Sequence, residues 1–293
     1  MTPMISQFSI IIPTWNNLPY LKLCIESIRK NSYQKHQIIV YANEGIDGTI
    51  EWIKNQRDIE FLSSEKNAGI CVAVNSCRAL VKAPYIVYMN DDMYVCPNWD
   101  WELHKSIEEI GHDRFMLSST LIEPRAVKNS NYISIVKDFG DNTNSFREDD
   151  LLKSYNELHK NDWCGASWPP SVVSTRVWDI VGGYSIEFSP GMYSDPDFSM
   201  KLWKYGVRIF KGIGKSKVYH FQSKSTGKVK KNNGNEMFLF KWSISAKVFY
   251  IYFLQMGKDY HGPLKDNVKI PFNKRLGNTL KRTYRNLVFN SSL

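Results

Sequence analysis

Two adjacent carboxylates follow a short hydrophobic run near residue 90. Tyr85 to Tyr88 is β-branched and aromatic, as is typical of a buried strand, and Asp91 and Asp92 come shortly after it. In open α/β sheets, ligands bind beyond the carboxyl ends of the strands. Two acids at that edge repel each other, so we expect a hard divalent cation there, with a phosphate completing its shell. The alternative is a solvated turn, because Asn and Asp are common turn residues.

A second pair of acids brackets a proline much later in the chain. Asp195, Pro196 and Asp197 precede a helical pattern that runs to Tyr205. An Asp at the N-cap followed by Pro at the first helical position is a common way for a helix to begin. A residue at the mouth of a helix can also face a ligand crevice, so capping and chemistry are compatible here.

The elements that must position these acids alternate between strand and helix. The predicted strands are 8–12, 37–41, 59–62, the run before Asp91, and two short ones at 207–210 and 217–221. The predicted helices begin near Pro19 and cover 50–53, 69–81, 176–181 and 196–205, with a helical pattern from Glu236 onward. This alternation predicts an α/β fold with a mostly parallel sheet flanked by helices and right-handed crossovers.

The charge is divided unevenly along the 293 residues. Residues 1–200 carry 18 Lys/Arg and 26 Asp/Glu, a balance of −8, whereas residues 201–293 carry 20 Lys/Arg and three acids, a balance of +17. The basic third suggests a polyanionic partner. An alternative function is therefore a non-catalytic protein that uses this third to bind nucleic acid or an anionic surface. That alternative leaves the two acidic motifs unexplained, and no recognised nucleic-acid motif is present.

The compartment is expected to be the cytoplasm. No stretch approaches the roughly 18 apolar residues of a spanning helix, and residues 1–7 do not have the pattern of a secretory signal. Five cysteines, an odd number without a CxxC pair, indicate a reduced protein without structural zinc.

Several short motifs occur in one order over residues 8 to about 221. They are Ile10-Ile11-Ile12-Pro13-Thr14-Trp15-Asn16-Asn17, Asp47-Gly48-Thr49, Asn67-Ala68-Gly69 with Ala73 and Asn75, Asn90-Asp91-Asp92, Gly182-Gly183-Tyr184, Asp195-Pro196-Asp197-Phe198 and His220. Singly each motif is weak. Together and in this order, they make the chain resemble the family 2 glycosyltransferases, inverting enzymes of the GT-A fold that use nucleotide-sugar donors.

The resemblance assigns a nucleotide site to the first motifs. Pro13 would end the first strand and leave the backbone groups of Thr14 and Trp15 free to meet a nucleobase. Asn67, Gly69 and Asn75 would lie at or near a helix N-terminus that favours phosphate or ribose oxygens, although simple capping of that helix explains them equally well. The family usually has an acid at the end of the second strand. That position is Ala42 here, and we expect Asn43 or Glu44 to substitute for it.

The resemblance also assigns the chemistry. Asp92 and His220 would bind Mn²⁺ or Mg²⁺, and Asp91 would contact ribose or a metal-bound water. Asp195 would be the general base, with Asp197 orienting the base or the acceptor. Trp168 and Tyr193 would face the acceptor, although core packing is the more frequent fate of a Trp.

The resemblance implies two parts and one reaction. Residues 1–225 would form the GT-A catalytic domain, and 226–293 a basic, mainly helical C-terminal extension. The domain would transfer a sugar from a nucleotide-diphosphate donor to a glycan or lipid-linked glycan, as in surface polysaccharide or glycoconjugate synthesis, with no nucleic-acid partner. The extension, through Phe249, Tyr252 and Phe253, would place the protein peripherally on an anionic membrane at its inner face. Alternatively, the extension packs on the core as a solvated helical face.

Overall fold

The computed structural model of the chain describes residues 7–126, 133–222 and 232–290. The strands are β1 (Phe8–Trp15), β2 (Gln37–Asn43), β3 (Ile59–Ser64), β4 (Tyr85–Tyr88), β5 (Met93–Val95), β6 (Phe115–Glu123), β7 (Ser134–Val136), β8 (Trp163–Cys164), β9 (Ser171–Ser174) and β10 (Ile209–His220).

Helices surround these strands on both sides. The α-helices are α1 (Leu18–Asn31), α2 (Thr49–Lys54), α3 (Ile70–Cys77), α4 (Trp99–Ile110), α5 (Glu148–Ser154), α6 (Thr175–Val181), α7 (Ser194–Lys204), α8 (Gly234–Trp242), α9 (Ala246–Val248) and α10 (Phe272–Asn290). Short 3₁₀ turns are η1 (Arg78–Leu80), η2 (Tyr155–Glu157) and η3 (Ile186–Phe188), and η5 (Phe249–Phe253) is a π-helical turn.

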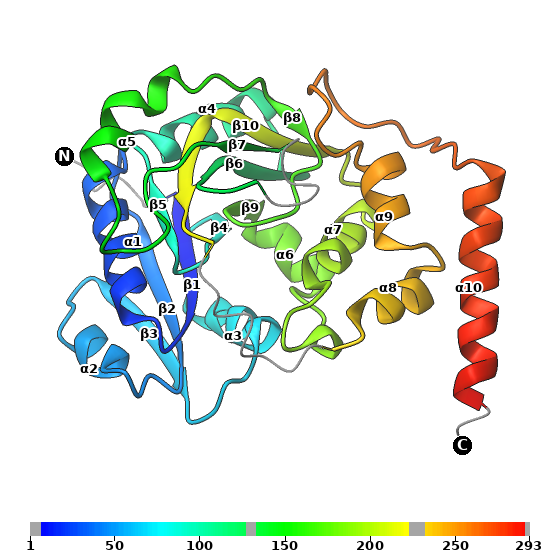
Figure 1. Cartoon of the computed structure of the whole chain (residues 1–293), viewed down its shortest axis with the longest axis horizontal. Coiled ribbons are helices and arrows are strands. Elements are labelled where there is room, and N and C mark those ends of the chain that lie inside the picture. Colours follow the sequence, from blue (N-terminus) through cyan, green and yellow to red (C-terminus); the bar gives the residue numbers. More distant parts are fainter. Residues whose placement is uncertain (1–6, 127–132, 223–231, 291–293) are drawn as a thin grey trace.

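One ten-stranded mixed sheet runs through the molecule (Figure 1). Its order is β3-β2-β1-β4-β9-β6-β10-β5, with β7 beside β6 and β8 beside β10. The half made of β3, β2, β1 and β4 is parallel, as predicted, whereas β9 is antiparallel to both of its neighbours. Because parallel strands share their direction, the carboxyl ends of β1, β2 and β4 meet at one edge.

Both faces of the sheet are buried, which explains why its central strands are continuously hydrophobic. Ile10 and Ile12 of β1 pack in one core cluster with residues of α1 and α4, and Ile11 packs in a second cluster with residues of α3, α6 and α7. This alternation follows from the two-residue period of a strand.

Two predictions about strands were wrong. Residues 207–221 were expected to form two short strands, but β10 is one long strand with an irregularity between Ile213 and Lys217. Pro13 does not end β1, which pairs with β2 as far as Trp15. Strand β4 pairs with β1 only up to Ile11, so Pro13 lies where β1 has a single neighbour, a position that tolerates proline.

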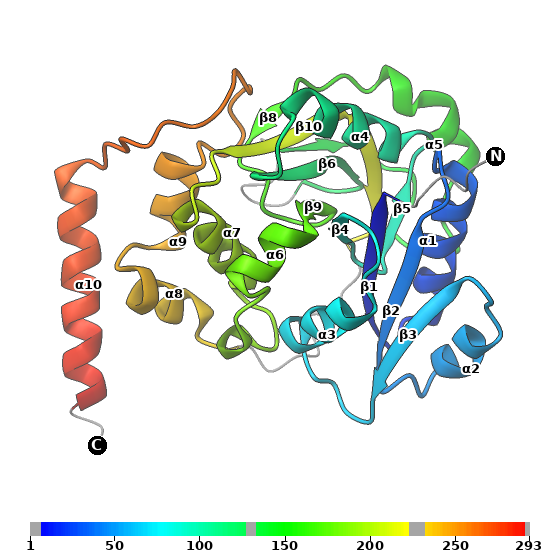
Figure 2. The same cartoon turned by 180° about the vertical axis from the view of Figure 1, so that it is seen from behind.

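The division expected between residues 225 and 226 falls outside the described residues, and the core does not divide near it. Phe238 of α8, Phe249 of η5 and Leu264 are buried in the same cluster as Phe198 of α7. The chain then runs without a helix or strand from Leu254 to Pro271, along the edge of the molecule, and ends in α10 (Figure 2). Within the described residues, no helix is long and apolar enough to cross a bilayer.

Candidate active site

The acids after β4 lie at the carboxyl edge of the sheet and are nearly buried. Asp91 is 9% exposed and Asp92 is 6% exposed. The Thr14 hydroxyl at the end of β1 donates a 2.6 Å hydrogen bond to Asp91 Oδ2. Burial and the charge of Asp92 raise the pKa of Asp91 to about 7, although the Thr14 hydrogen bond opposes this. Two charges in this space repel each other, and a cation would relieve the repulsion.

His220 meets Asp92 because of strand register. It ends β10 opposite Met93 of β5, and its Nε2 lies 3.4 Å from Asp92 Oδ2. Its Nδ1 lies 3.1 Å from Oε1 of Glu123, which ends the neighbouring strand β6. Burial lowers the pKa of His220, but the two carboxylates outweigh this and raise it to about 10. Without a metal, the imidazolium therefore bridges the two acids.

The donor set suits a metal that shares its shell with a diphosphate. A carboxylate and an imidazole are ligands of Mn²⁺, and Mg²⁺ is usually held by one or two carboxylates together with substrate phosphates. Within residues 7–126, 133–222 and 232–290, no three His, Cys, Asp or Glu side chains are arranged to enclose a metal by themselves. The residues present thus fit a metal that arrives with its nucleotide.

The residues expected to bind the nucleotide form one hydrogen-bonded network at the ends of β1 and β2. Asn43 donates to the Thr14 carbonyl at 3.3 Å and accepts from the Ala68 N–H at 2.9 Å, which ties β1 and β2 to the loop after β3. Glu44 accepts from the Asn16 amide at 2.9 Å. The indole of Trp15, together with Asn16 and the Asn67 N–H, lowers the pKa of Glu44.

The loop before α3 is shaped by Asn67 and Gly69. The Asn67 side chain accepts from the Gly69 N–H at 2.9 Å, and Gly69 has a φ of +78°. A Cβ on Gly69 would lie 2.8 Å from Pro190 Cα, so only glycine fits here. Asn75 lies further along α3, and both its amide atoms bond the backbone of Tyr184 at 2.7 and 2.8 Å. Its nucleotide contact stays a prediction, while its observed contact joins α3 to the segment before α7.

Asp195 lies in the first turn of α7, but it is not the N-cap. The helix begins at Ser194, and Tyr193, with a φ of +69°, occupies the cap position. The alternative of Asp195 as a simple cap was therefore wrong. Its Oδ1 accepts instead from the Tyr184 hydroxyl at 3.2 Å. Asp195 keeps some exposed surface, yet it is crowded by protein atoms, and this desolvation raises its pKa to about 7. That value suits a general base at neutral pH.

Asp197 holds α7 in place. Its side chain is 0% exposed and accepts hydrogen bonds from the Ser185 hydroxyl at 2.6 Å and the Trp242 indole at 2.8 Å. Lys241 Nζ is 2.9 Å away. This geometry supports orientation of the base through the helix, since an acceptor could reach Asp197 only if these bonds opened.

Aromatic residues surround the base. The Trp168 indole donates to the Tyr250 hydroxyl at 3.1 Å, and the two rings pack edge to face. Trp168, Tyr193 and Tyr250 are all half-buried. Desolvation raises the pKa of Tyr250, and the charge of Asp195 raises it further.

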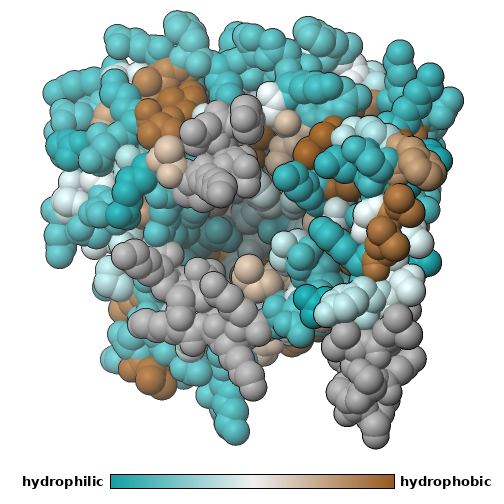
Figure 3. All heavy atoms as spheres, turned by 45° about the vertical axis from the view of Figure 1, so that its right-hand side comes forward, coloured by the Kyte–Doolittle hydropathy of each residue, from teal (hydrophilic) through white to brown (hydrophobic). Residues whose placement is uncertain are grey.

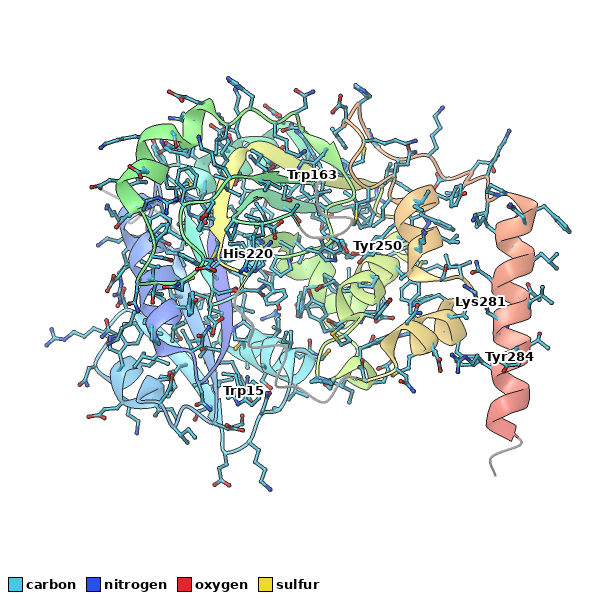
Figure 4. All side chains as sticks on the ribbon, viewed as in Figure 1. Trp15, Trp163, His220, Tyr250, Lys281 and Tyr284 are labelled. Atoms are coloured by element: carbon cyan, nitrogen blue, oxygen red, sulfur yellow. The ribbon has the colours of Figure 1, made fainter. Side chains whose placement is uncertain are left out.

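The two acidic motifs face a common region. Burial raises the pKa of Tyr88 well above its ordinary value, and the charges of Asp195, Asp91 and Asp92 raise it further. The Tyr88 ring also packs edge to face on Tyr184 at 5.8 Å between ring centroids, and the Tyr184 hydroxyl donates to Asp195, so this pair of tyrosines connects the two acidic motifs. His220 and Tyr250 lie toward the middle of the molecule (Figure 4), and the molecular surface has a hollow with a hydrophilic floor (Figure 3).

Three residues of this site were missed from the sequence. Glu123 has no motif, although it is an acid at a strand end. Tyr184 was matched within the Gly182-Gly183-Tyr184 motif, but its hydroxyl contact with Asp195 was missed because it depends on the fold. Tyr250 lies in the segment that was assigned to the C-terminal extension.

Comparisons with known proteins agree with this arrangement. The family model described as "Glycosyl transferase family 2" matches residues 9–162. Over 105 residues the chain is 27% identical to glycosyltransferase GlyG of Streptococcus pneumoniae, covering 34% of this chain and 35% of GlyG. It is 24% identical over 110 residues to glycosyltransferase GlyA of the same organism, covering 36% of this chain and 16% of GlyA. The match thus spans about a third of GlyG and less of GlyA.

Solved structures share the fold at low sequence identity. TarS 1–349 of S. aureus in complex with UDP has a TM-score of 0.54 at 16% identity, covering 73% of this chain and 60% of that one. GalNAc-T7 with UDP, GalNAc and Mn²⁺ has a TM-score of 0.58 at 12% identity, covering 85% and 50%. The predicted GT-A fold is confirmed, and the chain belongs to glycosyl transferase family 2.

Proposed function

We propose that the chain transfers one sugar from a nucleoside-diphosphate donor to a hydroxyl group of a glycan, with inversion at the anomeric carbon. The observation that carries the proposal is a chain of contacts between two acidic groups: Tyr88, which ends β4 shortly before Asp91, packs on the ring of Tyr184 at 5.8 Å, and the Tyr184 hydroxyl donates to Asp195. One group, at the end of β4, suits a metal and a diphosphate. The other, Asp195, suits removal of a proton.

Asp195 is the proposed base. It takes the proton of the acceptor hydroxyl as that oxygen forms a bond to the anomeric carbon. The bond from this carbon to the diphosphate oxygen breaks on the opposite face, and its electron pair leaves with the nucleoside diphosphate. Tyr184 keeps the Asp195 carboxylate oriented.

Asp92 and His220 would hold Mn²⁺ or Mg²⁺ when the nucleotide is bound. The metal would neutralise the negative charge that develops on the departing diphosphate. Asp91, hydrogen-bonded to Thr14, would accept from ribose or from water in the shell of the metal. Thr14, Trp15, Asn43 and Glu44 would border the base and ribose.

The acceptor would lie against Trp168, Tyr193 and Tyr250, because aromatic faces pack on the C–H faces of sugars. We place the reaction in surface polysaccharide or glycoconjugate synthesis, on a glycan or a lipid-linked glycan. All five cysteines are buried and unpaired, which supports a cytoplasmic location. The basic C-terminal third supports peripheral contact with an anionic membrane.

A Tyr184→Phe substitution is expected to move the pH profile upward. It keeps the ring that stacks on Phe198 but removes the hydrogen bond that stabilises the charged form of Asp195. The pKa of Asp195 should then rise above about 7, by about one unit for a lost bond of ~1 kcal/mol. The measurement is the pH dependence of kcat/KM, whose acid limb should shift to higher pH. An unshifted limb would show that Tyr184 does not act on the base.

The experiment that tests the function is thermal denaturation of the full chain with a panel of nucleoside diphosphates, with and without Mn²⁺. One nucleotide should raise Tm in the presence of Mn²⁺, since ligand binding stabilises the folded state. A parallel titration with DNA at several salt concentrations tests the binding alternative. DNA binding without stabilisation by any nucleotide would favour that alternative.

A further inference from the structure

Helix α10 lies at the margin of the molecule, after the long irregular segment from Leu254 to Pro271 (Figures 1 and 2). It is held against α8 by few contacts. Arg285 forms a 2.7 Å ion pair with Glu236, Arg282 donates to the Ser243 hydroxyl, and Asn278 is buried between the helices. The rest of its described side chains are largely exposed.

The outer face of α10 carries a stripe of large hydrophobic side chains, one every four residues. Their exposed fractions are 78% for Phe272, 46% for Leu276, 60% for Leu280 and 65% for Tyr284. At about 100° per residue, this stripe sweeps about 120° of the helix surface, and Asn278 lies on the opposite side. The stripe therefore points away from the body of the protein.

The rest of the helix surface, outside the stripe, is strongly cationic. Residues 272–290 contain five basic residues and no Asp or Glu, the basic ones being Lys274, Arg275, Lys281, Arg282 and Arg285. Lys281 and Tyr284 both lie on this marginal helix (Figure 4). Lys274 and Lys281 are exposed and have no ion-pair partner among the described residues.

We propose that α10 docks on an anionic lipid surface, with its hydrophobic stripe at the headgroup boundary and the basic side chains that do not contact α8 among the headgroups. Exposed apolar residues bordered by Lys and Arg are the pattern of a helix that lies in a membrane interface. A second copy of α10 would not suit this face, because two such helices would bring together Lys274, Arg275 and Lys281 of each copy, and the helix carries no acid to pair with them. Anionic lipid complements the stripe and the charge together.

This inference corrects the residues expected to touch the membrane. Phe249 was expected at the surface, but it is 0% exposed in the core, whereas Leu276 and Leu280 of α10 are exposed. The docking does not depend on the proposed reaction. A corollary is that the acceptor is lipid-linked, and this corollary rests on the proposed function. Helix α8, against which α10 packs, also contacts Asp197 through Trp242, so a membrane bound by α10 would lie on the side of the molecule that carries the proposed base.

The test is co-sedimentation of the full chain with vesicles of phosphatidylcholine alone or with about one third phosphatidylglycerol. Wild type should bind the mixed vesicles at low salt and lose affinity as salt rises. Leu276→Ser/Leu280→Ser should weaken binding at least ~10-fold by removing apolar contact. Lys274→Glu/Lys281→Glu should also weaken it at least ~10-fold and remove most of the salt dependence.

The matched control reverses two exposed charges far from α10. Lys54→Glu/Arg57→Glu makes the same change in net charge at α2, on the opposite side of the molecule (Figure 1), and should bind nearly as well as wild type. Wild type that ignores anionic vesicles, or a control that loses binding as the α10 variants do, would overturn the proposal. A wild-type dimer that becomes monomeric in Leu276→Ser/Leu280→Ser would also overturn it, by showing that the stripe joins two copies.

Discussion

An Asp195→Asn variant should turn over its donor at least ~10²-fold more slowly than wild type and still bind the nucleotide. The factor is the low end for loss of a general base, and Asn keeps the size of the side chain and can accept from Tyr184. The measurements are kcat with saturating substrates and the calorimetric Kd of the nucleotide with Mn²⁺. Loss of nucleotide binding together with activity would show that Asp195 belongs to the donor site.

The pKa of Asp195 gives the same variant a second signature. The base must be ionised, so wild-type activity should rise with pH through about 7. The folded-state pKa lies above the ordinary value of 3.8, so the folded state binds the proton more tightly and the carboxyl costs stability as pH rises toward 7. Asp195→Asn should therefore unfold at a higher Tm than wild type at pH 8. The gain in the free energy of unfolding is at most ~4 kcal/mol, and it is smaller because Asp195 is partly exposed.

Asp197→Asn is the matched control, since it makes the same chemical change two residues away. Asp197 is fully buried and contacts Lys241, which also pairs with Glu187, so the substitution removes a buried charge that Lys241, Ser185 and Trp242 all contact. It should lower Tm at pH 8 instead of raising it. If both variants are equally destabilised, Asp195 is a structural residue of α7.

The second large effect is expected at the metal. Asp92→Asn removes the charge of the proposed metal ligand while keeping its shape, so metal-dependent transfer should fall by at least ~10²-fold. The rate is measured against Mn²⁺ concentration. Asp58→Asn, which breaks an exposed ion pair with Arg29, should leave the rate unchanged. Activity near wild type with an unchanged Mn²⁺ dependence would remove Asp92 from the metal site.

The parallel half of the sheet could be predicted from the sequence because the hydrophobic pattern of each strand is local to that strand. Ile10 to Ile12 and Tyr85 to Tyr88 are continuous runs of β-branched and aromatic residues, as is typical of strands buried on both faces. The ends of those strands then placed Asp91 and Asp92 at the ligand edge without any tertiary information. The end of β1 was predicted wrongly at Pro13, because a strand tolerates proline where it has only one neighbour, and the sequence does not show how far β4 extends beside β1.

Other parts of the site depend on contacts that no local pattern records. Glu123 reaches His220 only because β6 and β10 are neighbours, and Tyr184 reaches Asp195 across a turn. The same is true of the C-terminal third. Both η5 and α10 have hydrophobic side chains at regular spacing, and the sequence does not show which of the two segments packs on the core. The core covers η5, so Phe249 is buried and Leu280 is exposed.

The central claim is metal-dependent transfer from a nucleotide sugar, and release of nucleoside diphosphate tests it most directly. The full chain is incubated with a panel of nucleotide sugars, with Mn²⁺ or with a chelator, and the released nucleoside diphosphate is quantified. We expect release from one donor, dependent on Mn²⁺ and lost in Asp92→Asn. No release from any donor by folded protein with Mn²⁺ or Mg²⁺, or release that is unaffected by the chelator and by Asp92→Asn, would contradict the account.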